Sequence, residues 1–263
     1  MSSTVGSLER GLRILDLLFE VSADPVRREK GLSVQQAASE LDIHKSSASR
    51  LMQTLAAAGY AVPVSETRRG FRLGPAVLAY SGIQEVHQRF AEAARPHLVR
   101  LVEETGECAH AAVSTGAAAL VIDDVETTRP LRVVAGKGRR VPLHCTSAGK
   151  CLLAVGLAAV PADLPPRTTR TITSAKVLAA HVEDIASRGY AIDDEENDMG
   201  VRCISAPVYD GPDGAPVGVI GIDGPATRLT PESLKDLAAH VVAVAADITA
   251  ALGGRSAVTG TAG

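Results

Sequence analysis

The chain has 263 residues and a net charge of −3, with 46% hydrophobic and 22% charged residues. This length suits two domains, and the composition is that of a globular protein, which excludes an intrinsically disordered chain. No run approaches about 18 apolar residues, so no transmembrane helix is predicted. Because the first residues lack the pattern of a secretory signal, we expect a cytoplasmic protein without membrane contact.

The first predicted helix is indicated by an apolar stripe at helical spacing, made by Leu8, Leu12, Leu15 and Phe19. A polar loop containing Pro25 is expected over residues 23–30. Ser33, followed three residues later by Gln36, has the spacing of a capping box, which predicts that a second helix begins there.

A third helix is predicted after a short break at residues 41–43, and it ends near Gly59. Two extended runs follow, at residues 60–64 and 71–73, joined by the sequence SETRRG. Three helices and a small basic hairpin are the pattern of a winged helix-turn-helix domain. We predict that this domain spans residues 1–74.

A helical linker is predicted over residues 75–90, and the helical pattern continues, after an interruption, to Gly106. The pattern then becomes strand-like, with runs at residues 108–114, 119–125, 131–136, 203–210 and 217–223. Further helices are expected at residues 148–155, at residues 174–188 and after Thr230. The sequence therefore predicts an α+β domain with a mostly antiparallel sheet over residues 91–253, and a disordered tail over residues 254–263.

The third predicted helix has a polar face suited to DNA. In helix-turn-helix proteins the start of this helix enters the major groove, where small hydroxyls and backbone N–H groups bind phosphates. Arginine and glutamine on the same face can reach guanine and adenine. A solvated helix is the alternative for this stretch alone, but the neighbouring break and basic hairpin favour DNA binding. The predicted DNA-binding residues are Lys45, Ser46, Ser47, Ser49, Arg50, Gln53, Arg68 and Arg69.

Charge is distributed unevenly along the chain. Residues 43–75 contain five Lys or Arg residues and one acid, a local balance of +4, whereas residues 193–196 are all acidic. A basic region on an otherwise acidic chain is typical of a DNA-binding domain. Since the chain has only three Phe, four Tyr and no Trp, binding of single strands by base stacking is not expected. Double-stranded DNA is the predicted partner.

The cysteines and histidines show no spacing typical of a metal site, so neither a metal nor a cofactor is predicted. An enzymatic alternative would use Cys203 or Cys145 as a nucleophile, with His144 as the base. No local signature supports it, and adjacent His and Cys residues on a strand face opposite sides. We therefore predict no enzyme activity. A second alternative is a C-terminal domain that only oligomerises.

Several long blocks resemble the IclR family of bacterial transcriptional regulators. They include SLERGLRILDLL, GLSVQQAASELDIHKSSASRLMQTLAAAGY, RRGFRLG, PLRVVAGKGRRVPLHCTSAGKCLLA and RGYAIDDEENDMGVRCISAPV. The blocks cover nearly the whole chain in order. The resemblance implies a GAF-like C-terminal domain that binds a small effector, commonly a carboxylate. It also implies a homodimer or tetramer on a palindromic operator, either as repressor or as activator.

The expected effector site lies in the second domain. A helix predicted to begin at Ser147 could hold an anion on its backbone N–H groups, and Asp193 and Cys203 flank an acidic loop. The resemblance implies contacts at these residues, and it aligns two serines of small-acid sensors with a glycine and an aspartate here. This departure predicts a hydroxylated or aromatic carboxylic acid in place of the smallest oxo acids. The predicted effector residues are Ser147, Ala148, Asp193, Val201, Cys203, Gly221 and Asp223.

Overall fold

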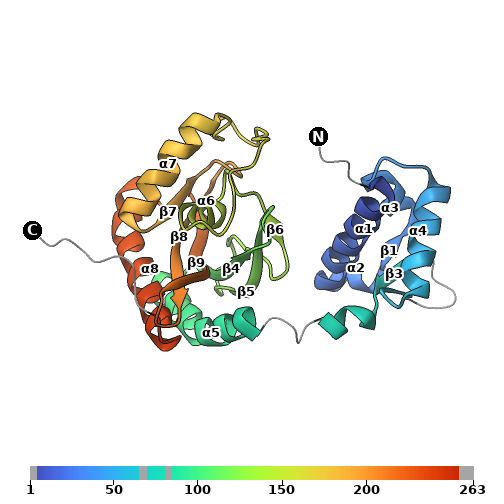
Figure 1. Ribbon diagram of the computed structural model, residues 1–263, viewed down its shortest axis with the longest axis horizontal. Coiled ribbons are helices and arrows are strands. Elements are labelled where there is room, and N and C mark those ends of the chain that lie inside the picture. The colour runs from blue at the N-terminus through green and yellow to red at the C-terminus, as the bar shows by residue number, and fades with distance from the viewer. Residues whose placement is uncertain (1–4, 65–69, 81–84, 255–263) are drawn as a thin grey trace, which may run out of the picture. The chain divides into compact units, whose positions relative to one another are not determined.

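The computed structural model describes residues 5–64, 70–80 and 85–254, which divide into two compact units, Met1–Gln84 and Glu85–Gly263 (Figure 1). Two sequence predictions fall outside the described residues. These are the contacts of Arg68 and Arg69 and the disorder of the last nine residues. Within the described ranges, no helix combines the length and apolar character needed to cross a membrane.

The helices of the first unit differ from the prediction near its start. They are α1 (Gly6–Ala23), α2 (Pro25–Lys30), α3 (Val34–Glu40) and α4 (Lys45–Ala57). The loop predicted over residues 23–30 is wrong, because α2 occupies most of it. Asp24 caps α2 by accepting hydrogen bonds from the N–H groups of Val26 and Arg27, at 2.8 and 3.1 Å. Pro25 lies at the start of the helix, where a backbone N–H would have no partner within the helix, so the missing N–H of proline costs no hydrogen bond.

Helix α1 is present as predicted, but the stripe that predicts it is buried only in part, where Leu15 packs against the core. Leu8 and Leu12 are 62% and 54% exposed, because the helix turns a neighbouring stripe inward. The inward residues, Ile14, Leu17, Leu18 and Val21, pack with Ala37, Ala48 and Met52 of the next helices. An isolated helix with two apolar stripes does not indicate which of them meets the core.

The helix-turn-helix consists of α3 and α4. The predicted capping box is present, since Ser33 Oγ accepts from Gln36 N at 3.2 Å and Gln36 Oε1 accepts from Ser33 N at 2.9 Å. Between the helices, Asp42 has a φ of 49°, in the left-handed region that Asp tolerates better than most residues. The turn therefore redirects the chain within a few residues and begins α4 at Lys45.

The first unit also contains a three-stranded antiparallel sheet with the order β1-β3-β2. The hairpin consists of β2 (Ala61–Pro63) and β3 (Gly70–Leu73), as predicted, and β1 (Leu32–Ser33) pairs with the outer edge of β3. Two residues are too short to show strand periodicity, which explains why β1 was not predicted. The segment Pro75–Tyr80 forms the 3-10 helix η1.

The second unit is built on an antiparallel sheet with the order β6-β5-β4-β9-β8-β7. Its strands are β4 (Cys108–Ser114), β5 (Ala119–Val125), β6 (Arg140–Val141), β7 (Ala191–Asp194), β8 (Val201–Asp210) and β9 (Ala215–Pro225). The strand predicted at residues 131–136 is wrong. Val133 and Val134 of that run line a cavity instead of pairing with a strand. Strand β7 was not predicted, because its acidic residues concealed the alternation of inward and outward side chains that indicates a strand.

Helices cover both faces of this sheet (Figure 1). Side chains of α5 (Glu85–Thr105) and α8 (Pro231–Ala251) pack against one face, which includes Ala109, Ala111 and Ile222. Side chains of α6 (Ser147–Ala154) and α7 (Ala175–Arg188) form a second core with Ala112 and Val219 from the other face. The domain is therefore α+β, as predicted, with a layer of helices on each side of an antiparallel sheet.

Candidate functional site

Helix α4 presents a polar face without acidic residues. Lys45, Ser46, Arg50 and Gln53 are exposed, and Ser47 and Ser49 are half-buried, whereas Ala48 and Met52 on the other side are buried. The N-cap residue, His44, makes no side-chain hydrogen bond to the first turn. The N–H groups at this end of α4 can therefore bond an external anion, which the helix dipole also favours.

The second unit concentrates polar side chains on the face of the sheet that α6 covers. In strand register, Cys108, Asp223, Cys203 and Asp193 lie opposite one another across β4, β9, β8 and β7. The next row on the same face contains His110, Gly221 and Ser205. Since alternate residues of a strand face the same side, these two rows make one polar surface from four strands.

Helix α6 begins directly over this surface. Ser147 Oγ is 2.8 Å from Ser205 Oγ, and Thr146 caps the helix by accepting from Gly149 N at 3.0 Å. A side chain on Gly149 would meet Leu143 Cα and Pro142 O at 2.5 Å, so only glycine allows this approach. Gly149 N bonds the cap and Lys150 N bonds Thr146 O, which leaves the N–H groups of Ser147 and Ala148 available to a ligand.

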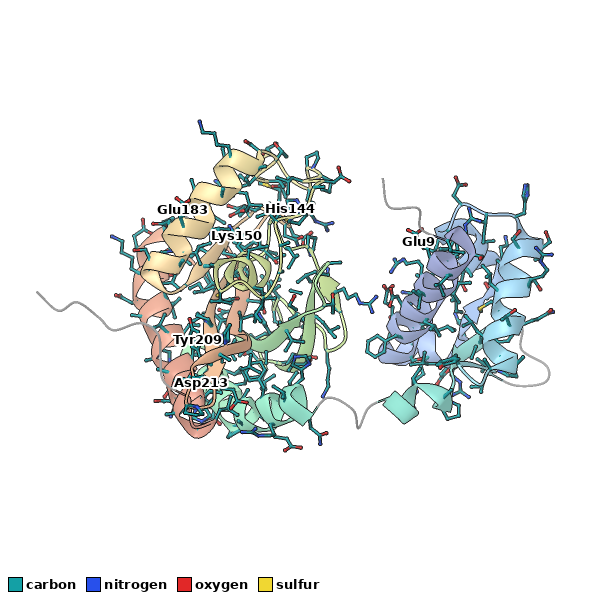
Figure 2. All side chains as sticks on the ribbon, viewed as in Figure 1. Glu9, His144, Lys150, Glu183, Tyr209 and Asp213 are labelled. Atoms are coloured by element: carbon teal, nitrogen blue, oxygen red, sulfur yellow. The ribbon has the colours of Figure 1, made fainter. Side chains whose placement is uncertain are left out.

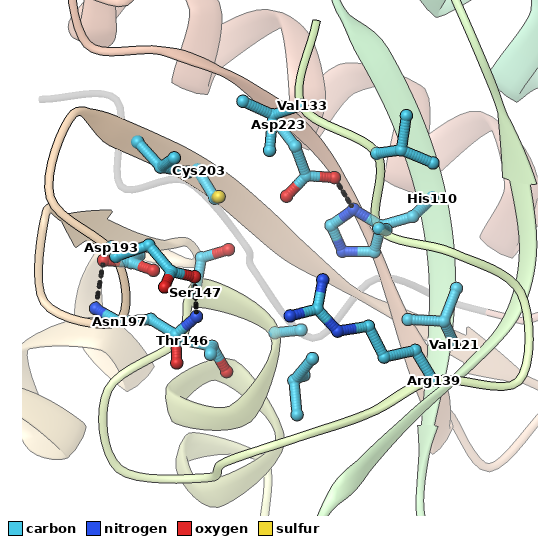
Figure 3. Close-up of a pocket in the computed structure, with 16 residues that line it drawn as sticks. His110, Val121, Val133, Arg139, Thr146, Ser147, Asp193, Asn197, Cys203 and Asp223 are labelled. Carbon is cyan, nitrogen blue, oxygen red and sulfur yellow. Dashed lines mark hydrogen bonds and ion pairs between the residues drawn. The ribbon is translucent and has the colours of Figure 1, made fainter. Parts of the chain in front are cut away.

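A cavity of about 60 Å³ lies between the start of α6 and the polar rows (Figure 3). Its lining includes six of the seven predicted effector residues, namely Ser147, Ala148, Asp193, Val201, Cys203 and Asp223. Gly221 is not among the lining residues. The ring of His110 lies over it, and a Cβ on Gly221 would come within 2.9 Å of His110 Cε1.

Ten lining residues were not predicted as effector residues from the sequence, and His110 and Arg139 are the two of them that matter most for the chemistry of the cavity. His110 Nδ1 lies 2.6 Å from Asp223 Oδ2, and both side chains are less than one-tenth exposed. The side chain of Arg139 points into the cavity and makes no hydrogen bond or ion pair with the described residues (Figure 3). His110 faces Asp223 only through strand pairing over more than 100 residues, and no local sequence pattern records that pairing.

The ionisable groups of the cavity are strongly affected by burial. Asp193 Oδ1 accepts hydrogen bonds from the N–H groups of Glu196 and Asn197, at 2.8 and 3.3 Å, yet burial raises the pKa of Asp193 to about 7. Burial alone would lower the pKa of His110, but the charge of Asp223 and the hydrogen bond to it raise that pKa above its ordinary value. Asp223 therefore favours the protonated form of the His110 ring.

A second buried pair holds the loop after β7. Lys150 of α6, which lies in the interior of the second unit in Figure 2, binds Glu196 through Nζ and Oε1. Lys150 and Glu196 are 1% and 7% exposed. Among the buried side-chain atoms of the described residues, Glu196 Oε2 is the one without a hydrogen-bond partner. This pair fixes the loop whose N–H groups bond Asp193.

The cysteines do not form a catalytic arrangement. The sequence places His144 and Cys145 on a strand, but in the structure they lie in a turn before α6. His144 Nε2 is 3.0 Å from Pro165 O, and burial raises the pKa of Cys145 to about 12. Burial also raises the pKa of Cys203 well above its ordinary value, so neither thiol supplies a thiolate at neutral pH. No group of three or more His, Cys, Asp or Glu side chains in the described ranges is arranged to hold a metal ion.

Comparisons with known proteins agree with this architecture. Residues 7–65 match the family model of the IclR helix-turn-helix domain, and residues 84–250 match that of the bacterial transcriptional regulator IclR C-terminal domain. The chain is 33% identical to the HTH-type transcriptional regulator BhcR of Paracoccus denitrificans, over 94% of this chain and 88% of that protein. It is 30% identical to the HTH-type transcriptional repressor AllR of Escherichia coli, over 94% and 90% of the two chains.

A solved structure shows the same arrangement of elements. The Thermotoga maritima IclR structure matches 95% of this chain and 100% of its own, with a TM-score of 0.63 and 28% identity. The similarity extends over both units of the chain, so it is not limited to the DNA-binding helices.

Proposed function

Because the chain belongs to the IclR family of bacterial transcriptional regulators, we propose that it binds a palindromic operator through α4 and the hairpin β2–β3. We also propose that a short carboxylic acid binds in the cavity of the second unit and changes the affinity of the protein for this operator. The observation that carries the effector proposal is the cavity itself. It joins free helix N–H groups, an arginine that forms no ion pair with the described residues, and two buried acids from two strands, Asp193 of β7 and Asp223 of β9.

The DNA contacts are proposed for the polar face of α4. Exposed Arg50 and Gln53 are long enough to reach base edges, and the serines of the first turn can bond phosphates. One winged domain contacts too few base pairs for a unique genomic site, so we expect a homodimer or tetramer. The exposed stripe of Leu8 and Leu12 on α1 supports association between copies.

The cavity favours a short acid with a hydroxyl group over an aromatic acid. A water molecule needs about 10–15 Å³, so the cavity of about 60 Å³ corresponds to about four to six water-sized positions. Lactate has six non-hydrogen atoms and benzoate has nine, so the shorter acid matches these positions better. The proposed carboxylate lies at Ser147 and Ala148 with Arg139 beside it, and a ligand hydroxyl donates to Asp193 Oδ2, which accepts no bond from the described residues.

The DNA half is tested with an operator selected from a random duplex library by the full chain. Arg50→Ala should weaken operator binding by about 1–3 kcal/mol and change random-duplex binding little. The control is Lys176→Ala, which removes an exposed positive charge from α7. Fluorescence anisotropy measures both. Equal losses on both duplexes would show that Arg50 contacts the backbone only.

The effector half uses the same operator with lactate, glycerate and benzoate. We expect a short hydroxy acid to change operator affinity at least tenfold and to lose this effect in Asp193→Ala. If none of these acids changes the operator affinity, the result favours a second unit that acts in assembly alone. Light scattering would then report the same oligomer in the presence and in the absence of each acid.

A further inference from the structure

His110 presents to the cavity a ring nitrogen that bonds none of the described residues. His110 lies on β4, opposite Gly221 of β9, and it reaches diagonally to Asp223 two residues further along β9. Its Nδ1 is occupied by Asp223 Oδ2 at 2.6 Å. Its Nε2 has no hydrogen-bond partner among the described residues, and the ring lines the cavity (Figure 3).

The charge of Asp223 determines what this nitrogen presents. A buried carboxylate without a donor is costly, and His110 supplies the donor that Asp223 needs. The other charged groups near the ring are Asp124 of β5 and the guanidinium of Arg139, and the Cys203 thiol beside Asp223 remains protonated. Against the effect of burial, the charge of Asp223 and the hydrogen bond to it raise the pKa of His110, which favours the ring with both nitrogens protonated. In that form Nε2–H is a donor that faces the cavity.

The missing side chain at Gly221 is part of the same arrangement. A Cβ there would lie 2.9 Å from His110 Cε1 and 2.6 Å from Ser205 Oγ, and it would also meet Ile204 O. Glycine at this position therefore makes room for the imidazole ring. His110, Gly221 and Asp223 therefore act together. The imidazole ring of His110 occupies the space beside Gly221, and the carboxylate of Asp223 fixes the orientation of the ring.

We propose that His110, held by Asp223, is a specificity-determining residue of the effector site and donates a hydrogen bond to a second oxygen of the ligand. The inference rests on the proposed function, and it adds a chemical requirement to it. The effector carries an acceptor oxygen in addition to the carboxylate bound at α6. A hydrocarbon acid of the same size leaves the Nε2–H group desolvated and unpaired, which costs affinity.

Isosteric acids isolate this requirement. Pyruvate and isobutyrate each have six non-hydrogen atoms and share a carboxylate, but only pyruvate has an oxo group, which can accept and cannot donate. Acetoacetate and 3-methylbutyrate make the same comparison with the acceptor one carbon further away. Calorimetry with the full chain should show at least tenfold tighter binding of the oxo acid in at least one pair.

The variant His110→Asn tests the residue without removing the partner of Asp223. The amide nitrogen of Asn takes the position of Nδ1 and can still donate to Asp223, whereas nothing replaces Nε2. We expect the preference for the oxo acid to fall below about threefold, with isobutyrate binding unchanged. The control His181→Asn, on the exposed side of α7, should keep the native preference. Circular dichroism and thermal unfolding establish that each variant is folded.

A second variant keeps the outcome clear if His110→Asn does not fold. His110→Gln places its amide nitrogen near the position of Nε2 and should retain part of the preference for the oxo acid.

The possible results separate the two proposals. Equal affinities within both native pairs would overturn the role of His110 and leave the effector proposal intact. An equal loss of both pair members in His110→Asn would make the residue structural and would also overturn the inference. If none of the four acids binds the native chain, while lactate or glycerate changes operator affinity, the acceptor requirement alone is refuted. If no acid acts in either experiment, the effector proposal fails with it.

Discussion

Replacing Asp193 with Asn should stabilise the second unit, and the gain should grow with pH. Burial, with a smaller contribution from the charge of Glu196, raises the pKa of Asp193 to about 7 from 3.8. A folded-state pKa above the unfolded value means that the native chain binds more protons between these pH values. Its stability therefore falls as pH rises through this window. Asn keeps the shape and can still accept from the N–H groups of Glu196 and Asn197.

The magnitude follows from the size of the shift. A pKa raised by about three pH units costs the native chain about 4 kcal/mol of unfolding free energy, at 1.36 kcal/mol per pH unit. The full cost is reached by about pH 8.5. At pH 5 the unfolded carboxylate is already ionised, so about 1–2 kcal/mol of this cost is present there. The difference in unfolding free energy between Asp193→Asn and the native chain should therefore increase by about 2–3 kcal/mol from pH 5 to pH 8.5.

The assay can follow the second unit by itself. All four cysteines, Cys108, Cys145, Cys151 and Cys203, are buried in this unit. Brief thiol labelling after equilibration in urea therefore reports its unfolding, with the pulse set so that the unfolded chain is fully labelled at each pH. Groups that titrate in both proteins cancel in the comparison. A stability difference that is the same at pH 5 and pH 8.5 would refute a pKa near 7 for Asp193.

Three further results are expected. Lys150→Met should destabilise the second unit by about 3–5 kcal/mol in the thiol assay, because it leaves Glu196 buried and unpaired. The double variant Lys150→Met, Glu196→Leu should recover most of this loss, and equal stabilities of the single and double variants would contradict the prediction. Gly221→Ser should lower the midpoint of urea unfolding, because its Cβ would contact Ile204 O and displace the His110 ring. An unchanged midpoint would mean that β9 can shift to accommodate the added side chain. Arg139→Gln should weaken lactate binding several-fold by calorimetry, and unchanged binding would exclude the guanidinium as the carboxylate partner.

Local sequence patterns predicted the parts of the fold that depend on local interactions. The capping box at Ser33 and the third helix are set by residues a few positions apart, and both are present in the structure. The loop predicted around Pro25 was wrong, because proline is equally suited to a loop and to a first helical turn. The strand predicted at residues 131–136 was wrong, because an apolar run can line a cavity as well as join a sheet.

The polar cavity was predicted less completely than the fold. Ser147, Asp193 and Cys203 were singled out by their sequence context, and the structure brings them to one cavity. His110 was missed because its role depends on a partner 113 residues away. Asp223 has a donor in the imidazole of His110, so the ligand does not have to supply one. In our proposal the ligand therefore offers an acceptor at this end of the cavity.

The pairing of β4 with β9 has a consequence for synthesis of the protein. His110 leaves the ribosome long before its partner strand, since the two sides of the pair are separated by 113 residues. At about 5–20 residues per second, the ribosome needs about 6–23 s to supply Asp223 after His110. During that interval β4 lacks one of its two neighbours, and its buried edge is available to chaperones or to another nascent chain. Codon usage between these strands should therefore affect the yield of folded protein more than codon usage within the first 84 residues.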